Sequence, residues 1–312
     1  MGSSKGVSFN PSRDIPDLSG KVILVTGGNS GLGEESILQL AKHKPAKIFM
    51  GARSEAKANE AINKIRKIIQ DANIVFLEMD LASFASVKKA TQQVLATTDR
   101  LDILMNNAGI MATPAAVTTD GYEIQFGTNH MGHALLNKLL LPLLEKTAAE
   151  PNSDVRIVTL SSVAHTMAPK EGVVFSEVTS PMESTSSWTR YGQSKLANIY
   201  FTAQMAKLYP KIKSVSVHPG VVSTNLAVSG PSQTYKLLRP LFYFLNRYLF
   251  TSVGKGALNQ LWAATGKRED IKQGGFYYPV GVEYKASLLV TDTEFAGHLW
   301  EFTERELQDH GY

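Results

Sequence analysis

Cysteine is absent from this chain of 312 residues, so disulfide bonds, thiolate metal sites and a cysteine nucleophile are excluded. A long apolar run is missing too. The longest candidate, residues 237–250, is shorter than the ~20 residues that a membrane-spanning helix needs, and Arg239, Pro240, Asn246 and Arg247 interrupt it. We therefore expect no transmembrane segment, and we expect no metal site.

Runs of like charge are missing as well. The chain has 32 Lys and Arg against 28 Asp and Glu, a formal net charge of +4 that is scattered along the sequence. This pattern argues against nucleic acid as a partner. Residues 1–19 are polar and lack the apolar core of a signal peptide. We expect them to form a flexible lead-in, and we expect a cytoplasmic protein with at most a peripheral membrane contact.

A repeating pattern is present: a short apolar run, a turn and a helical segment. The apolar runs are Lys21–Thr26, Lys47–Gly51, Asn73–Met79, Leu101–Asn106, Val155–Leu160 and Ser214–His218, with a last strand expected at Gly275–Val280. Continuous apolar strands separated by helices predict a parallel sheet covered on both faces. With right-handed crossovers this is a three-layer, doubly wound Rossmann fold of mostly seven parallel strands, in one α/β domain over residues 20–312.

A glycine-rich turn at residues 26–33 joins the first expected strand to the first helix. Glycine lets the backbone turn tightly and approach a pyrophosphate, and the helix N-terminus offers free N–H groups with partial positive charge. The spacing Gly27-x3-Gly31-x-Gly33 differs from the general G-x-G-x-x-G fingerprint. We interpret the turn as a phosphate-binding turn, with a purely structural turn as the alternative.

The residue after the second expected strand bears on the choice of dinucleotide. NAD-binding proteins place an acid about twenty residues past the turn, whereas NADP-binding proteins place a cation there. This chain has Arg53, twenty residues after Gly33, and a guanidinium pairs well with phosphate. Asn29 in the turn could assist. The sequence favours NADP(H), and a solvated surface arginine is the alternative.

Tyr191 and Lys195 are four residues apart in a helical segment, so they share one face. Hydride transfer to a carbonyl leaves an oxygen that needs a proton. A tyrosine can supply it if a nearby ammonium lowers its pKa from ~10. The spacing alone is common in helices. Residues 106–109, 161–162 and 218–220 add weight, because each follows a different expected strand at the same edge of the sheet.

Together these residues resemble the short-chain dehydrogenase/reductase family. The matching motifs are Thr-Gly-x3-Gly-x-Gly at 26–33, Asn-Asn-Ala-Gly at 106–109, a serine at 162, Tyr-x3-Lys at 191–195 and a Pro-Gly turn at 219–220. The likeness extends from about residue 20 to about residue 305. Residues 122–130, 161–165 and 191–198 are most similar to the retinol-dehydrogenase-like and WW-domain-oxidoreductase-like branch.

The resemblance implies roles for matched residues. Tyr191 would be the general acid/base, Lys195 would lower its pKa and hold the nicotinamide ribose, and Ser162 would bind the substrate oxygen. Asn129 would hold a water that links Lys195 to solvent. The implied cofactor-binding residues are Gly27, Asn29, Ser30, Gly31, Leu32, Gly33, Arg53, Asp80, Leu81, Asn107, Ala108, Gly109, Tyr191, Lys195, Pro219, Gly220, Val222 and Thr224.

Two features depart from the family pattern. Ser162 and Tyr191 are 29 residues apart, farther than in the shortest members, although the retinol-type branch shares such an insertion. Membrane-bound members of that branch carry an N-terminal hydrophobic anchor, which we do not expect here.

Residues 222–250 follow the sixth expected strand and are rich in large apolar side chains. The favoured interpretation is a lid over a lipophilic or aromatic substrate. An ordinary core helix and an interfacial helix resting on lipid are the alternatives. The sequence leaves open whether the protein is a monomer or a homodimer.

The favoured function is an NADP(H)-dependent oxidoreductase that interconverts a carbonyl and an alcohol on a lipophilic or aromatic small molecule. Reduction of a conjugated C=C bond would use the same tyrosine and lysine. A non-catalytic nucleotide-binding scaffold is the other alternative, because a fold does not fix a function. We favour an enzyme, since every expected catalytic residue is present.

Overall fold

The computed structural model describes residues 6–222, 234, 251–284 and 292–312. Seven strands form one sheet, all parallel, in the order β3-β2-β1-β4-β5-β6-β7. They are β1 (Val22–Thr26), β2 (Lys47–Ala52), β3 (Ile74–Glu78), β4 (Ile103–Asn106), β5 (Arg156–Leu160), β6 (Lys213–Val217) and β7 (Phe276–Tyr277). The predicted doubly wound α/β fold is confirmed.

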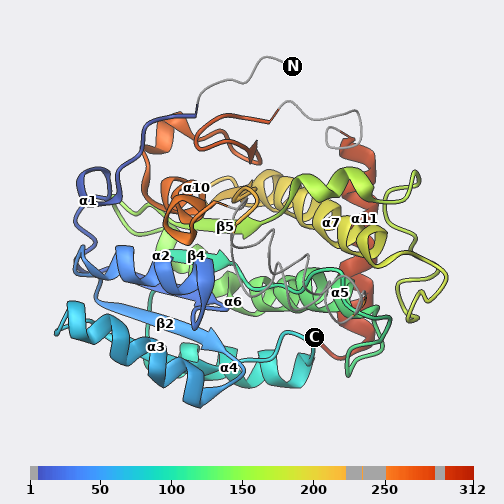
Figure 1. Cartoon of the computed structure of the whole chain (residues 1–312), viewed down its shortest axis with the longest axis horizontal. Coiled ribbons are helices and arrows are strands. Elements are labelled where there is room, and N and C mark those ends of the chain that lie inside the picture. The colour runs from blue at the N-terminus through green and yellow to red at the C-terminus, as the bar shows by residue number, and fades with distance from the viewer. Residues whose placement is uncertain (1–5, 223–233, 235–250, 285–291) are drawn as a thin grey trace.

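Helices connect the strands and cover the sheet (Figure 1). They are α1 (Pro11–Asp14), α2 (Gly31–Ala41), α3 (Glu55–Ile68), α4 (Phe84–Thr97), α5 (Ile124–Phe126), α6 (Gly132–Ala148), α7 (Ser187–Leu208), α10 (Val253–Thr265) and α11 (Thr293–Asp309), with a π-helical turn η1 (Gly127–Met131) and 3-10 turns η2 (Val163–Met167) and η4 (Arg268–Asp270). Serine caps fix two of the starts: the side chains of Ser54 and Ser83 accept hydrogen bonds from backbone N–H groups of α3 and α4.

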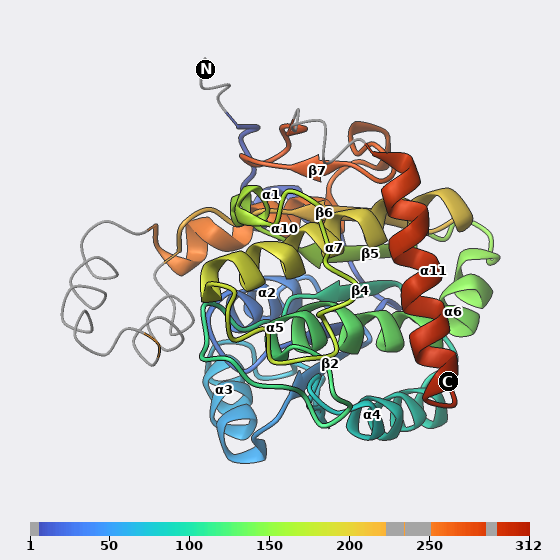
Figure 2. The same ribbon diagram turned by 90° about the vertical axis from the view of Figure 1, so that its right-hand side faces the viewer.

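Two apolar layers hold the helices against the sheet. Neighbouring residues on a strand point to opposite faces. Leu24 and Leu104 therefore pack with α4, α6, α7 and α11, while Ile23 and Ile103 pack with α2, α3 and α10. The two views in Figures 1 and 2 show the resulting helix–sheet–helix sandwich. Burial on both faces explains why the strands read as continuous apolar runs.

The last strand is shorter than the stretch predicted at Gly275–Val280, because β7 pairs with β6 only at Phe276 and Tyr277. Pro279 follows, and proline has no N–H to donate to a ladder.

The N-terminal segment also differs from its predicted form. Over residues 10–18 it is packed rather than free: Asn10 caps α1, and Ile15 and Leu18 are buried in the layer that contains α10. The backbone N–H of Val7 donates to the carbonyl of Val280 at 2.8 Å. Ile15 and Leu18 are isolated apolar residues without periodicity, so the sequence pattern did not indicate that this segment packs against the domain.

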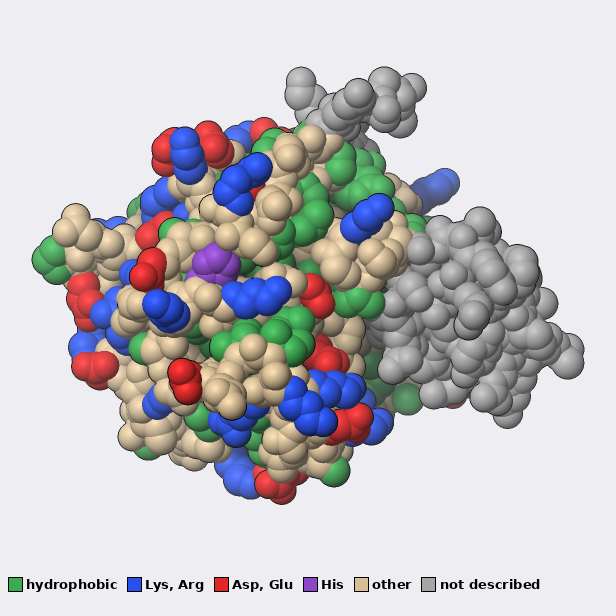
Figure 3. Space-filling model, turned by 60° about the vertical axis from the view of Figure 1, so that its left-hand side comes forward, with side chains coloured by type: hydrophobic (Ala, Val, Ile, Leu, Met, Phe, Trp, Pro, Cys, Tyr) green, Lys and Arg blue, Asp and Glu red, His purple; other side chains and the backbone are tan. Residues whose placement is uncertain are grey.

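The surface in Figure 3 carries Lys and Arg interspersed with Asp and Glu. Within the described ranges, no helix combines the length and the apolar character required to cross a bilayer.

The strand order reverses between β1 and β4, and this reversal leaves a crevice at the carboxyl ends of the strands, where sheets of this kind bind ligands.

Candidate active site

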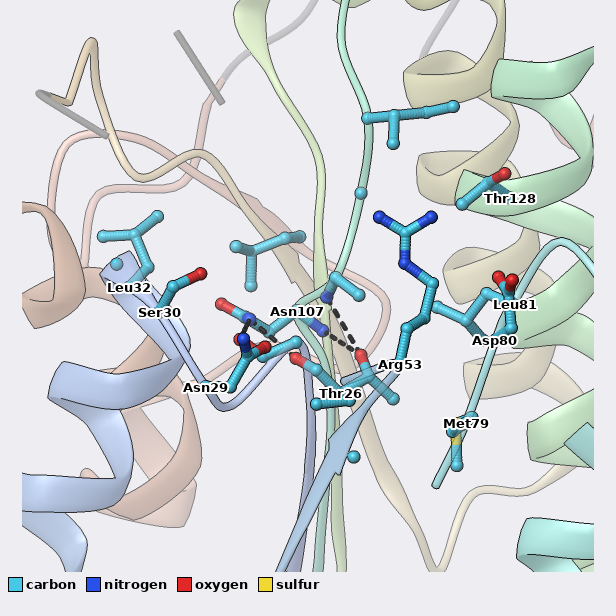
Figure 4. Close-up of a pocket in the computed structure, with 18 of the residues that line it drawn as sticks. Thr26, Asn29, Ser30, Leu32, Arg53, Met79, Asp80, Leu81, Asn107 and Thr128 are labelled. Carbon is cyan, nitrogen blue, oxygen red and sulfur yellow. Dashed lines mark hydrogen bonds between the residues drawn. The ribbon is translucent and has the colours of Figure 1, made fainter. Parts of the chain in front are cut away.

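A cavity of about 260 Å³ opens at this crevice, and Figure 4 shows residues that line it. The predicted site residues that line it are Gly27, Asn29, Ser30, Gly31, Leu32, Arg53, Asp80, Leu81, Asn107, Ala108, Gly109, Tyr191, Lys195 and Pro219. Met79, Ile110, Thr128 and Leu160 line it too and were not predicted. Met79, Ile110 and Leu160 lie at or just after strand ends, and that position is the signal that could have found them.

Other predicted site residues lie outside the lining. Asn129 and Ser162 are buried directly behind it, and Gly33 lies beneath the turn, where a Cβ atom would overlap the carbonyl oxygen of Gly27. Val222 packs against Gly256, and Gly220 is partly buried after β6. Thr224 lies outside the described residues.

The backbone of the glycine turn adopts a conformation and a close packing that side chains at its glycine positions would prevent. Gly27 and Gly31 have φ of 64° and 55°, in the left-handed region that favours glycine. A Cβ on Gly27 would lie 3.0 Å from the Cα of Ala108. The N-cap of α2, Ser30, makes no side-chain capping bond. The first N–H groups of α2 are therefore available to an anion in the cavity.

The cavity wall that follows β2 and β3 carries one cationic side chain, Arg53, and one acidic side chain, Asp80. Arg53 is exposed, and it extends into the same pocket as Asp80 and Leu81 (Figure 4). The carboxylate of Asp80 accepts the N–H of Ala82 at 3.0 Å, which fixes its position. Across the described part of the chain, the ion pairs found do not involve Arg53. Its guanidinium is therefore available to a ligand.

The predicted proton-transfer residues meet on α7. Nζ of Lys195 lies 5.7 Å from the centre of the Tyr191 ring and donates to the carbonyl oxygen of Leu160 at 3.0 Å. Ser162 is hydrogen-bonded to Tyr191, and its Oγ also accepts the N–H of Ala164 at 3.1 Å. The structure thus brings together three residues from the end of β5 and from α7.

Burial dominates the electrostatics of this group. It raises the pKa of Tyr191 to about 12, against the hydrogen bond from Ser162, and lowers the pKa of Lys195 to about 8. Both shifts have one cause, since a low-dielectric surrounding penalises the charged form. The sequence predicted that Lys195 lowers the tyrosine pKa. That role stays a prediction, because the causes of the Tyr191 shift are burial and the hydrogen bond of Ser162.

Asn129 sits in η1, and its side chain makes three hydrogen bonds. Its Oδ1 accepts the N–H of Ile110 at 2.8 Å, and its Nδ2 donates to the carbonyl of Ile110 at 3.0 Å and to Oγ of Ser194 at 2.9 Å. A Cβ on Gly109 would lie 3.0 Å from Oδ1 of Asn129 and 3.4 Å from Nζ of Lys195. A side chain at position 109 would therefore press on Asn129, and glycine avoids this contact.

Two side chains hold the loop that follows β4, which contributes Ile110 to the cavity lining. The N–H of Ala112 donates to Oε1 of Gln125 at 2.8 Å, and Oγ1 of Thr234 donates to the carbonyl of Ala112 at 2.6 Å. Thr234 belongs to residues 222–250, predicted to form a lid. Within that segment the structure describes Val222 and Thr234, and the rest of the prediction lies outside the described residues.

A buried ion pair joins this loop to the start of α7. Nη1 of Arg190 donates to Oε1 of Glu123 at 2.8 Å, and Nη2 donates to the carbonyl of Thr113 at 3.1 Å. Oε2 of Glu123 accepts the N–H groups of Gln125 and Phe126 at the start of α5. The pair therefore ties the residue before Tyr191 to the elements that precede Asn129.

Comparisons with known proteins agree with this geometry. A family model described as short chain dehydrogenase matches residues 21–178. An uncharacterized oxidoreductase of Schizosaccharomyces pombe is 38% identical over 307 residues, which cover 96% of this chain and 88% of that protein. Mouse retinol dehydrogenase 14 is 36% identical over 301 residues, covering 92% and 86%.

A solved structure has the same fold as this chain. The crystal structure of an uncharacterized protein from Mycobacterium paratuberculosis is 26% identical, covers 97% of this chain and 98% of its own, and has a TM-score of 0.74. The predicted resemblance is confirmed: the chain is an oxidoreductase that belongs to the short-chain dehydrogenase/reductase family, in its retinol-dehydrogenase-like branch.

Proposed function

We propose that the protein is an NADP(H)-dependent oxidoreductase that interconverts a carbonyl and an alcohol on a lipophilic or aromatic small molecule. One observation carries the proposal. Tyr191 and Lys195 line one end of a cavity, with Ser162 bonded to the tyrosine, while the glycine turn and Arg53 line the other. A dinucleotide has reactive and phosphate ends that need such separate surroundings.

The residues of the cavity fit a dinucleotide. The uncapped N-terminus of α2 suits a pyrophosphate, and the close approach of Gly27 to Ala108 leaves room for backbone contact only. Arg53 would hold a ribose 2′-phosphate, which is the basis for proposing NADP(H) over NAD(H). When bound, the nicotinamide exchanges a hydride with the substrate carbon.

The chain's own residues would manage the proton. In the reducing direction the Tyr191 hydroxyl donates its proton to the substrate oxygen, which Ser162 holds by a hydrogen bond. Lys195 in its cationic form stabilises the tyrosinate that remains. The main-chain carbonyl of Asn129 would hold the water that returns a proton from solvent, since both Nδ2 protons and one lone pair of Oδ1 of Asn129 already have partners.

Two observations support a lipophilic substrate. Residues 222–250 are rich in large apolar side chains, and Thr234 of that segment bonds the loop beside the cavity. The mouse relative is a retinol dehydrogenase by name, and retinol is a lipophilic alcohol.

A substrate panel tests the proposal. Ketones, quinones and aldehydes would be offered with NADPH and, separately, with NADH, and products would be identified by mass spectrometry. We expect oxidation of NADPH with an alcohol as product. A saturated carbonyl product would instead establish reduction of a conjugated C=C bond. Tight NADPH binding with no turnover across the panel would favour the scaffold alternative.

A further inference from the structure

His133 connects the two halves of the proposed site without lining the cavity. It is the second residue of α6, and its side chain is buried. Nδ1 of the ring lies 2.9 Å from the main-chain oxygen of Asn129 in η1, and Nε2 lies 2.9 Å from Oγ1 of Thr26, the last residue of β1. One imidazole therefore spans from the Asn129 carbonyl to the start of the glycine turn.

The hydrogen-bond inventory fixes the direction of every bond in this bridge. The carbonyl of Asn129 can only accept, so Nδ1 of His133 carries the proton. In a neutral ring Nε2 must then accept, and Oγ1 of Thr26 must donate to it. The competing acceptor, the carbonyl oxygen of Met105, is more distant from Oγ1, at 3.4 Å.

Thr26 completes the bridge on the side of the turn. Its Oγ1 accepts the N–H of Asn107 and that of Ala108, both at 2.9 Å. A hydroxyl has one proton and two lone pairs, so all three are now used. This junction joins the ends of β1 and β4 to α6. A second proton on the His133 ring, at Nε2, would face the proton of the Thr26 hydroxyl and would have no acceptor. Burial lowers the pKa of His133 to about 4, which keeps the ring neutral.

We infer that His133 is a positioning residue that locks the Asn129 main-chain carbonyl and the Thr26 hydroxyl into one frame, so that proton return and dinucleotide binding share a buried junction. The inference rests on the proposed function, because it assigns the Asn129 end of the bridge to proton return and the Thr26 end to dinucleotide binding. Losing the Asn129 end slows turnover, and losing the Thr26 end weakens dinucleotide binding.

Two substitutions separate the ends. In His133→Asn the amide can still donate to the Asn129 carbonyl but is too short to reach Thr26. We expect the Kd for NADPH to rise about fivefold, the worth of one hydrogen bond, with kcat within twofold. In His133→Gln the longer amide can accept from Thr26 but leaves the Asn129 carbonyl without its donor. We expect kcat to fall about fivefold, with the Kd within twofold.

His130 provides a matched control. It is an equally buried imidazole one turn earlier, but its Nε2 lies 3.0 Å from Oγ1 of Thr303 on α11, away from the cavity. His130→Asn and His130→Gln should lower Tm without separating Kd from kcat. The inference is overturned if the His133 variants change both constants by the same factor, as a loss of stability would, or change neither beyond twofold.

A measurement without substrate or dinucleotide keeps this inference separate from the proposed function. In protein labelled with ¹⁵N-histidine, His133 signals are those that vanish in His133→Asn. We expect a neutral ring at pH 7 with its proton on Nδ1, and a shift of the Nε2 signal in Thr26→Val. A proton on Nε2, or a cationic ring, would refute the bridge. Failure of the unsubstituted protein to bind NADPH or reduce any carbonyl would instead count against the proposed function.

Discussion

Nζ of Lys195 lies 5.7 Å from the centre of the Tyr191 ring, one helical turn away on α7, and both side chains are buried. Burial pushes both groups toward their neutral forms, since the pKa of Tyr191 rises to about 12 and that of Lys195 falls to about 8. Charge on the lysine is therefore sensitive to pH near neutrality, while the tyrosine keeps its proton.

Replacement of the tyrosine tests its chemistry directly. In Tyr191→Phe the proton donor is lost and the ring is kept, so we expect turnover to fall by a factor of about 10² or more, with the Kd for NADPH within about twofold of the unsubstituted protein. Tyr200→Phe is the control, because Tyr200 lies on the same helix but packs against Phe295 of α11. Near-normal turnover in Tyr191→Phe would refute the mechanism.

The rate of carbonyl reduction should depend on the charge of Lys195. The lysine is cationic below its pKa of about 8 and neutral above it, and only the cation stabilises the tyrosinate. We expect kcat to be level from pH 6 to 7.5 and to fall roughly tenfold per pH unit well above pH 8. The measurement is a pH profile with saturating NADPH. A rate that stays constant to pH 10 would contradict the assignment of Lys195.

Arg53 should discriminate between the two dinucleotides. Arg53→Ala removes charge-assisted hydrogen bonds worth about 1.5–3 kcal/mol, so we expect the Kd for NADPH to rise about 10- to 100-fold while the Kd for NADH changes little. Lys57→Ala is the control, because it removes an exposed cation from the first turn of α3 outside the cavity lining. Equal weakening of both dinucleotides would show that Arg53 does not read the 2′-phosphate.

Gly33 should tolerate no side chain. A Cβ there would overlap the Gly27 carbonyl oxygen and press on Nδ2 of Asn107, and overpacking costs about 1–3 kcal/mol. We expect Gly33→Ala to lower the free energy of unfolding by that amount and to weaken NADPH binding. Gly297→Ala on α11 has nothing within 4 Å and should raise helix stability by about 0.5–1 kcal/mol. Unfolding in urea measures both, and unchanged NADPH affinity in Gly33→Ala would contradict the role of the turn.

The buried pair of Glu123 and Arg190 should be more costly to break than a surface pair. Both side chains are at most 3% exposed. Glu123→Gln leaves the guanidinium without its charge partner, and we expect a loss of about 3–5 kcal/mol. Glu78→Gln, which breaks the exposed pair with Lys89, should cost less than about 1 kcal/mol. The double variant Glu123→Leu with Arg190→Met should recover much of the loss. Failure to recover would show that the bonds of the two side chains to the backbone, of Arg190 to Thr113 and Thr185 and of Glu123 to Gln125 and Phe126, dominate instead.

The sequence alone determined the sheet and located most residues of the candidate site. Strands buried on both faces must be apolar throughout, so the runs at β1, β2 and β5 could be located without coordinates. The glycine turn, Tyr191 and Lys195 have short, fixed spacings along the chain. Local geometry sets such spacings, and they can therefore be read from a sequence.

Only the tertiary structure decided which distant residues meet. Arg190 and Glu123 are 67 positions apart, and His133 and Thr26 are 107 apart. Their contacts depend on how α5, α6 and α7 pack against the sheet, and no periodicity encodes that packing. The same holds for the pKa of Tyr191, because the sequence shows a lysine four residues away but does not show how deeply both groups are buried. Burial is a property of the packed chain, and here it is the largest cause of the raised pKa of Tyr191.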